Sequence, residues 1–523
     1  MRFNEKLNLL MKMSNTTNML LAEALGIDPS LVSRWRTGSR DLSTHSRYIQ
    51  AMGIYFASRA KLDFQRVALL ELTGHTFEEK DVPESVIAGY LSRWLTNDSK
   101  ITSEAIETLL DTISQSTSVD SRIPHSIELP PEPSGTTLLA QSFTGIKGLQ
   151  EASIKLLMRA ASIGSQAKLL LYSDEPMDWI NSYPSFARMW AYLLMNCIRK
   201  GAKIQIIHTL ARDSNELAIA LEKWLPFYFS GAVNSYYYPR KLDSLFHHTH
   251  FVLQGHAAVT SFSVRGQDRH TIQYSFSTDV NYVKSIENLF VSELEQCRQL
   301  VQTMTGKALS QIPYQRAKFF SQPGTKCAGM ELLPTIGLPI TTLDHILERY
   351  EVPVEVRNTV IEQNKKYQQA LIEHAGKHDY TILLSLPRIS DVLKERVRAG
   401  AAELQVGHEC YYTVQEYLEH VRHIVELLNT YENVNVGIVP KKYMIPNVHA
   451  FAKPGAGMVV LKQNEPMFAF VSEQRDLTIA LYRHIMQQAS RLPKRERAKD
   501  FVIKRLETFI EKIESSLDQH THD

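Results

Sequence analysis

Short hydroxyl and guanidinium side chains recur between residues 28 and 40, in the segment DPSLVSRWRTGSR. They are Ser30, Ser33, Arg34, Arg36 and Arg40. Hydroxyls and guanidinium groups donate hydrogen bonds to phosphate oxygens, and the flat guanidinium also fits the two acceptors on the major-groove edge of guanine. These side chains therefore predict contacts with double-stranded DNA.

The residues just before this segment predict the helix and the turn that would position it. Leu21 and Leu25 place apolar side chains on one face of a first helix, and Ala22 is small enough for a second helix to cross closely over it. Gly26 can adopt the positive φ angle that turns the chain. A turn into a second helix is therefore expected.

The second helix is predicted from both of its ends. Asp28 is expected as the N-cap, and Pro29 suits the first helical position because its missing N–H is not needed there. Gly38 is expected to close the helix. The apolar positions that would face the core recur at helical spacing and are Leu31, Val32 and Trp35. The opposite face then carries the serines and arginines.

Residues 17–40 resemble the helix-turn-helix of lambda-repressor-like (Cro/cI-type) transcriptional regulators, with Ala22, Gly26 and Val32 at the spacing of that motif. The resemblance covers about the first 70 residues and implies a five-helix domain. Its other helices would be Arg2–Met13, Ser43–Ala57 and Phe64–Leu72. In that family the second helix of the motif enters the major groove, which implies the same serines and arginines as base or phosphate contacts. The alternative is an ordinary helical hairpin with a basic solvent face.

Length and charge place limits on the rest of the chain. The 523 residues suffice for about three or four domains. The 58 Lys and Arg nearly balance the 56 Asp and Glu, for a net charge of +2, so any charge that attracts DNA must be local. The first 70 residues hold about ten basic against about five acidic residues. The sequence therefore predicts a modest electrostatic attraction at its N-terminal end.

The four cysteines are far apart in sequence, so neither a zinc ribbon nor a disulfide framework is indicated. No apolar run approaches 18 residues, and the N-terminus has no apolar core or cleavage site of a secretory leader. A cytoplasmic protein without membrane contact and without a cofactor is expected.

Composition and periodicity divide the chain into six parts. Two helical patterns, Val82–Leu95 and Thr102–Ile113, precede a stretch rich in Ser, Pro and Thr. The predicted parts are a DNA-binding domain (1–75), a helical connector (76–113), a linker (114–143), a first α/β domain (144–305), a connecting segment (306–365) and a second α/β domain with a C-terminal helix (366–523).

The two α/β domains follow one pattern of elements. The first has the buried strands AKLLLYS and AKIQIIHT, a strand pair in HFVLQGHAAVTSFSV and a closing helix at Val283–Val301. The second has YTILLSL, ENVNVGIVP, a strand pair after residue 449 and a closing helix at Leu477–Ala489. Such patterns predict two mostly parallel sheets that meet at a pseudo-twofold interface. Chance similarity of two common patterns is the alternative.

The first copy resembles the phospholipase-D-like fold, a duplicated α/β unit, which implies the fold class: a helical DNA-binding domain followed by a duplicated, phospholipase-D-like α/β region. Active members carry His-x-Lys and then an Asp seven residues after the His. Here His248 matches the His, but His250 replaces the Lys and Gly255 replaces the Asp, and the second copy offers only His449. The resemblance thus implies an altered pocket and no catalytic residues.

Two further features admit two interpretations each. His248 and His250 point to one side of a strand and are interpreted as part of an effector pocket, with a metal site as the less favoured reading because no acid or thiol is close in sequence. The basic run RLPKRERAK at 491–499 is interpreted as a solvated helix start, with a second DNA contact as the alternative.

Together these patterns predict a sequence-specific DNA-binding transcriptional regulator that is not an enzyme. One small reading domain makes few base contacts, so a homodimer is expected to bind two half-sites. A small molecule or a protein effector would act through the C-terminal region. The principal alternative is a phosphodiesterase or nuclease of phospholipase-D-like type, delivered to DNA by the helix-turn-helix.

Overall fold

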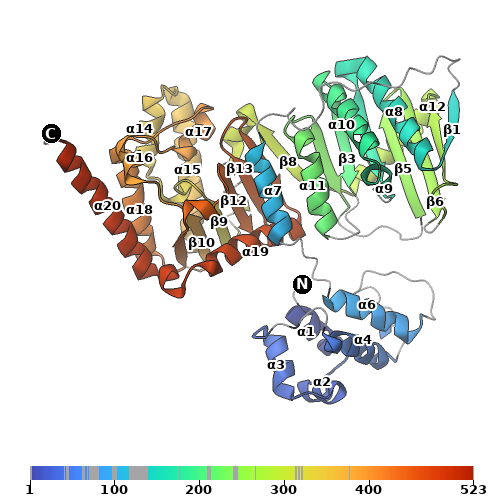
Figure 1. The fold of residues 1–523 in the computed structure, drawn as a ribbon, viewed down its shortest axis with the longest axis horizontal. Coiled ribbons are helices and arrows are strands. Elements are labelled where there is room, and N and C mark those ends of the chain that lie inside the picture. The colour runs from blue at the N-terminus through green and yellow to red at the C-terminus, as the bar shows by residue number, and fades with distance from the viewer. Residues whose placement is uncertain are drawn as a thin grey trace. The chain divides into compact units, whose positions relative to one another are not determined.

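A computed structural model describes residues 3–521, except 41, 43–45, 62–64, 67–68, 70–81, 97–102, 117–138, 176, 209–213, 239–245, 265–266, 313–314, 316–317, 320–321 and 376. The chain forms two compact units, Met1–Lys100 and Ile101–Asp523. Figure 1 shows a helical first unit and a second unit built on a sheet.

The regular elements of the first unit, within its described residues, are all helices. Its helices are α1 (Phe3–Met13), α2 (Asn18–Leu25), α3 (Pro29–Thr37), α4 (Arg47–Arg59) and α6 (Glu84–Thr96). They enclose one apolar core that includes Leu10, Leu21, Val32, Trp35, Phe56 and Leu91. Helices α4 and α6 approach closely at Gly53, where a Cβ would collide with Ser92 Oγ and the Ala88 carbonyl. The expected helix at residues 64–72 lies largely outside the described residues.

The described residues of the second unit form a 14-stranded sheet in the order β1-β7-β6-β5-β2-β3-β4-β8-β14-β13-β12-β9-β10-β11. The strands are β1 (Ala140–Thr144), β2 (Lys168–Ser173), β3 (Lys203–His208), β4 (Val233–Tyr237), β5 (Phe246–Leu253), β6 (Ala257–Val264), β7 (Gln273–Ser277), β8 (Arg298–Thr305), β9 (Lys326–Met330), β10 (Tyr380–Leu384), β11 (Val434–Ile438), β12 (Val448–Lys453), β13 (Gly457–Lys462) and β14 (Phe468–Ser472).

The fold class predicted from the sequence, with its duplicated phospholipase-D-like region, is wrong. The chain is a mixed α/β protein whose second unit has one continuous sheet instead of two mostly parallel layers. Among the described strands, β2–β3–β4 and β9–β10–β11 pair in parallel, and the other neighbours are antiparallel. The sequence predicts the closing helix at Val283–Val301. The helix found there, α12 (Val280–Glu295), ends earlier, and residues 298–305 form the strand β8. This strand pairs with both β4 and β14 and so joins the sheet across its middle.

The strand order recurs along the sheet. The order β7-β6-β5-β2-β3-β4 in the first half is repeated as β14-β13-β12-β9-β10-β11 in the second half. β4 and β14 run in the same direction, because β8 is antiparallel to both. Three further antiparallel pairings, β14–β13, β13–β12 and β12–β9, then reverse the direction, so the parallel strands of the two halves run in opposite directions. Their carboxyl ends therefore lie at opposite edges of the sheet.

Helices cover both faces of the sheet. One face carries α7 (Ser103–Gln115), α8 (Gly145–Ile163), α10 (Pro184–Arg199), α11 (Ser214–Tyr228) and α19 (Arg475–Arg491), which share one apolar core across both halves. On the other face, α12 (Val280–Glu295) covers the first half. The second half is covered there by α14 (Ile340–Arg349), α15 (Val354–Ala375), α18 (Val414–Thr430) and α20 (Lys499–Thr521). Among the described residues, no helix is both long and apolar enough to cross a membrane.

Candidate nucleic-acid interface

The turn between α2 and α3 is fixed by local backbone geometry. Gly26 ends α2 at φ +63°, in the left-handed region, and the next amide donates to the Ala22 carbonyl at 3.0 Å. Asp28 caps α3 because its Oδ1 accepts a hydrogen bond from the Ser30 amide at 2.8 Å. Gly38 ends α3 at φ +73°. The conformations predicted for these three residues are confirmed.

Helix α3 has one buried face and one outward face. Val32 and Trp35 are at most 1% exposed, and they anchor the helix in the core of the unit. The outward face holds side chains at i, i+3, i+4 and i+7, which are Ser30, Ser33, Arg34 and Thr37. Of these only Ser33 is half-buried, and the other three are exposed. A flat polar ligand surface can therefore meet one face of the helix.

Among the described residues, the hydrogen bonds of the Arg34 guanidinium go only to its own helix. Its Nε donates to the Ser30 carbonyl at 3.4 Å, and its Nη2 donates to Ser30 Oγ at 3.3 Å. Within the described residues it has no carboxylate at ion-pair distance. The pKa of Asp28 is lowered, first by the hydrogen bonds from Ser30 and also by the charge of Arg34. Most donors of Arg34 thus remain open to a ligand.

The Arg36 guanidinium is held by two amide side chains. Its Nε donates to Asn8 Oδ1 at 2.7 Å, and its Nη1 donates to Asn18 Oδ1 at 2.6 Å. Asn8 Nδ2 donates in return to the Arg36 carbonyl at 3.0 Å. These bonds connect α1, α2 and α3. The role of the two asparagines could not be predicted from the sequence, because an asparagine on a helix can form hydrogen bonds with many different partners.

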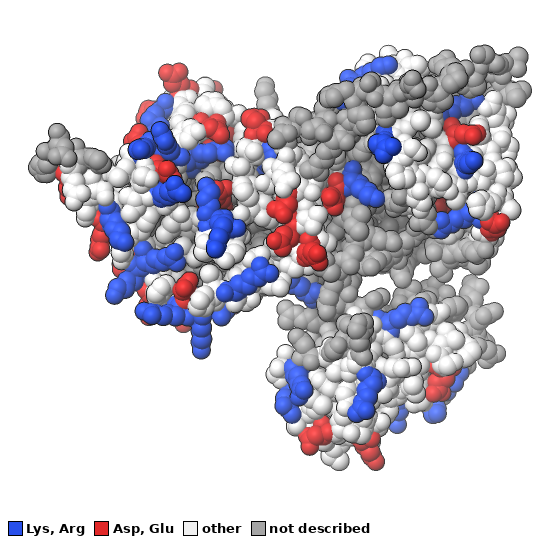
Figure 2. Space-filling view, in the orientation of Figure 1, with Lys and Arg blue, Asp and Glu red and all other residues white. Residues whose placement is uncertain are grey.

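Arg40 lies in the exposed loop after α3. Its amide donates to the Arg34 carbonyl at 3.3 Å, which continues the cap that Gly38 begins. Both signs of charge lie on the face of this unit in view in Figure 2, so the attraction for a polyanion is local to a few side chains.

The two predicted pocket histidines lie on β5 in different surroundings. His250 is buried, and its Nε2 lies 2.6 Å from Glu293 Oε2, with the rings of Tyr172 and Phe290 beside it. His248 is exposed and meets the ring of Phe262 edge-on. Neither histidine lines either of the two cavities described below.

A polar cluster joins the end of β2 to β5 and β7. Glu175 accepts hydrogen bonds from the Thr249 hydroxyl at 2.8 Å and the Tyr274 hydroxyl at 2.7 Å. Asp174 Oδ1 accepts from the His248 amide at 2.6 Å, and the His247 ring also lies within reach of it. Both carboxylates are thereby engaged within the protein. Among the described residues, no three His, Cys, Asp or Glu side chains gather as metal ligands would.

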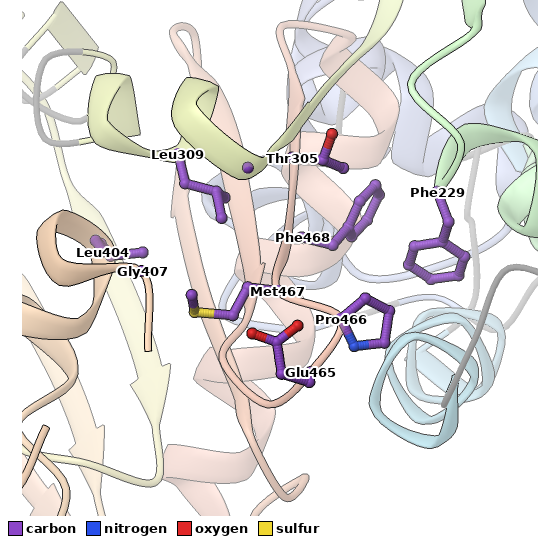
Figure 3. Close-up of a pocket in the computed structure, with 10 residues that line it drawn as sticks. Phe229, Thr305, Leu309, Leu404, Gly407, Glu465, Pro466, Met467 and Phe468 are labelled. Atoms are coloured by element: carbon purple, nitrogen blue, oxygen red, sulfur yellow. The ribbon is translucent and has the colours of Figure 1, made fainter. Parts of the chain in front are cut away.

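An apolar cavity of about 240 Å³ lies where the two halves of the sheet meet. Figure 3 shows its lining from both halves. The first half contributes Phe229, and the end of β8 and the turn after it contribute Thr305, Gly306 and Leu309. The second half contributes Leu404, Gly407, Glu465, Pro466, Met467 and Phe468. Most of the lining side chains are apolar, and the exposed Glu465 brings the one carboxylate of the lining. A smaller cavity of about 60 Å³ lies between α7 and α19 and includes His484.

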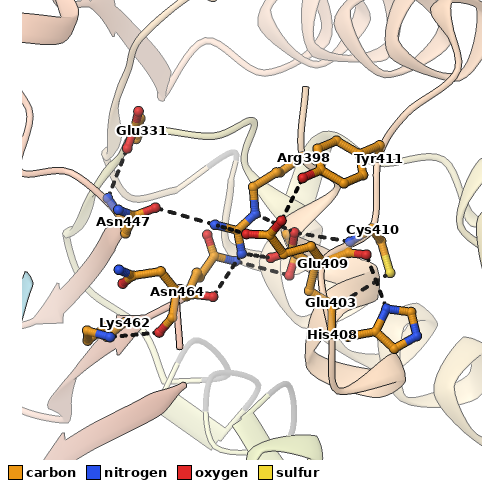
Figure 4. A network of polar contacts seen from close by, with 12 residues as sticks. Glu331, Arg398, Glu403, His408, Glu409, Cys410, Tyr411, Asn447, Lys462 and Asn464 are labelled. Carbon is orange, nitrogen blue, oxygen red and sulfur yellow. Dashed lines mark hydrogen bonds and ion pairs between the residues drawn. The ribbon is translucent and has the colours of Figure 1, made fainter. Parts of the chain in front are cut away.

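A buried ion pair connects several loops in the second half of the second unit (Figure 4). Arg398 Nε donates to Glu403 Oε1 at 2.7 Å, and its Nη2 donates to Oε2 at 2.8 Å. The same guanidinium donates to the Gln463 carbonyl at 2.8 Å and to Asn447 Oδ1 at 3.3 Å. Glu403 has no exposed surface, and burial raises its pKa although Arg398 opposes that shift. This network fixes loops to one another and leaves few donors for a ligand.

No protein-family model matches the chain, and no curated protein sequence matches it. Among solved structures, the chain is similar to TrmBL2, which is described as an archaeal chromatin protein with a novel mode of DNA binding. The identity is 13%, and the match covers 49% of this chain and 95% of that chain at a TM-score of 0.24. A TM-score of this size does not establish a common fold.

Proposed function

We propose that this chain is a sequence-specific DNA-binding transcriptional regulator of the lambda-repressor-like helix-turn-helix type, in which α3 enters the major groove of duplex DNA. The observation that carries the proposal is the outward face of α3. Ser30, Arg34 and Thr37 are exposed on it, while Val32 and Trp35 hold the helix from behind. A helix presented in this way has the width and the donors that the major groove accepts.

The side chains of this face have different roles in the proposal. Arg34 contacts base edges, since its guanidinium is open and stands beside the exposed start of α3. Ser30 and Ser33 donate to phosphates, and Arg40 approaches the backbone from the next loop. Arg36 is a positioning residue that sets the angle of α3 through Asn8 and Asn18.

The second unit would supply dimerisation and regulation. One copy of α3 reads only a few base pairs, so two copies on two half-sites are needed for a unique site. The cavity between the halves of the sheet is a place where a small effector could favour one arrangement of the unit over another. In this proposal the protein is a homodimer, responds to an effector, acts in the cytoplasm and has no hydrolytic activity.

The test is binding of the full chain to an operator selected from random duplexes. Arg34→Ala is expected to weaken specific binding by about 1–3 kcal/mol and to relax the preference at one base pair. The matched control is Arg93→Ala, which removes an exposed cation of the same unit from α6 and should leave binding unchanged. Unchanged affinity and base preference in the Arg34 variant would remove α3 as the reading helix.

A further inference from the structure

A second basic surface lies in the second unit, at the junction of α19 and α20. Four cations stand within seven residues, and they are Arg491, Lys494, Arg495 and Arg497. All four side chains are exposed. Figure 2 shows blue side chains gathered over this part of the second unit, where α19 ends and α20 begins. We call these four residues the basic corner.

The backbone of the basic corner is firmly held. Residues Lys494–Arg497 form a 3-10 turn whose amides at Glu496 and Arg497 donate to the Pro493 carbonyl at 2.9 and 3.3 Å. Leu492 is buried just before the turn. Lys499 follows it and donates through Nζ to the carbonyls of Tyr431 and Glu432 at 2.6 and 2.9 Å. The backbone that carries Lys494, Arg495 and Arg497 is thus held at both of its ends.

In the described part of the chain, no ion pair involves a cation of the basic corner. Arg491 Nη1 donates to Gln488 Oε1 at 3.1 Å, and the Arg495 guanidinium lies over the Phe501 ring. Residues 491–497 hold four cations and one acid, Glu496, so the local charge is strongly positive and the cations repel one another. A polyanion that bound there would remove this repulsion and release counterions.

We propose that the basic corner binds the phosphate backbone of duplex DNA, as a contact separate from α3. The inference rests on the proposed function, because a chain that α3 brings to DNA offers its other basic surfaces a high local concentration of phosphates. Arginine predominates in the corner, and its guanidinium fork donates to two phosphate oxygens at once. Such contacts carry no base preference, so the corner adds affinity without specificity.

The experiment measures DNA affinity of the full chain against salt concentration, between about 50 and 200 mM KCl. In the double variant Arg495→Gln/Arg497→Gln, the slope of log affinity against log salt should fall by nearly two, since each phosphate contact contributes about 0.9. The loss should be equal on operator and on unrelated duplex. The matched control, Lys365→Gln/Lys366→Gln, removes two exposed cations from α15 and should leave the slope unchanged.

The outcomes separate this inference from the proposed function. An unchanged slope in the corner variant, with weaker operator binding in Arg34→Ala, overturns the corner and leaves α3 as the reader. A smaller slope, with no effect of Arg34→Ala, supports the corner and removes α3. If the corner variant loses binding to vesicles containing phosphatidylserine but keeps its DNA slope, the corner serves a lipid surface and the inference is overturned. Should the double variant fail to melt like the native chain, the single variants Lys494→Gln and Arg497→Gln are each expected to lower the slope by about 0.9.

Discussion

The outward face of α3 and the network around Arg398 use the same chemical group in opposite ways. Within the part of the chain that the structure describes, the Arg34 guanidinium donates only to Ser30 of its own helix, and the side chain is exposed. Arg398 is 14% exposed at its side chain and meets both oxygens of the buried Glu403. A guanidinium whose donors are filled by the protein stabilises the fold, whereas an open one is available to a ligand. The surroundings of an arginine, more than its identity, indicate its role.

The largest effect on stability is expected when the Arg398 guanidinium loses its carboxylate partner. Glu403→Ala leaves the Arg398 guanidinium without its carboxylate in a buried place, so the free energy of unfolding should fall by about 3 kcal/mol. Urea unfolding of the full chain measures it. Glu362→Ala is the control, because it removes only an exposed pair with Lys365 and should change little. Equal effects of the two variants would show that the Arg398 network does not stabilise the fold.

Arg36 lies between the two extremes, since neutral amides hold its guanidinium. Arg36→Ala should lower the stability of the first unit by about 1–2 kcal/mol, because two hydrogen bonds between helices are lost. Arg34→Ala should leave that stability unchanged. Thermal unfolding followed with the Trp35 and Trp94 signals distinguishes them. If Arg36→Ala melts like the native chain but loses its preference at one base pair, Arg36 is a direct base contact instead.

The buried, neutral side chain of His420 is expected to make the stability of the second unit depend on pH. His420 Nε2 donates to the Pro334 carbonyl at 3.0 Å, and its Nδ1 accepts from the Tyr412 hydroxyl at 2.9 Å. Burial lowers the pKa of His420 to about 3, so the unfolded chain takes up a proton near pH 6.5 that the folded chain refuses. Stability should therefore be complete above pH 6.5 and fall as the pH drops toward 3.

This contribution is measured as a difference between variants. The native chain should lose up to about 1.4 kcal/mol per pH unit more than His420→Gln over that interval, because glutamine does not titrate. Urea unfolding at several pH values gives both slopes. Parallel slopes in the two proteins would mean that His420 is protonated in the folded state.

The smallest expected effect is none at all. Phosphoryl transfer through a covalent histidine requires cations around the phosphate, but His250 is bound to Glu293 and Gly255 has no side chain at the place of the acid. The purified chain should leave single- and double-stranded DNA and a chromogenic phosphodiester intact over hours, with or without divalent metal. Turnover that His248→Ala abolishes would replace the regulator proposal with the nuclease alternative.

Sequence reasoning succeeded where one residue determines local geometry. Gly26, Asp28 and Gly38 have strong conformational preferences, and their predicted conformations are the ones found. It failed where the partner is distant in sequence. Strand β9, KCAGM, is short and contains a lysine and a glycine, so its sequence does not resemble a buried strand, and it lies in the predicted connecting segment. Strand β8 forms by pairing with β4 and β14, which are distant in sequence. Arg36 is likewise held by Asn8 and Asn18, which lie on other helices.

The strand β8 has a mechanical consequence. Its pairing with β14 runs from Phe468 opposite Thr305 to Val471 opposite Gln302, directly beside the cavity lined by Phe468 and Thr305. A hinge between the halves would have to break this ladder of backbone hydrogen bonds, whereas a twist or shear of the sheet strains it only slightly. A molecule bound in that cavity would therefore change the twist of the whole sheet. It would not open a hinge between the two halves.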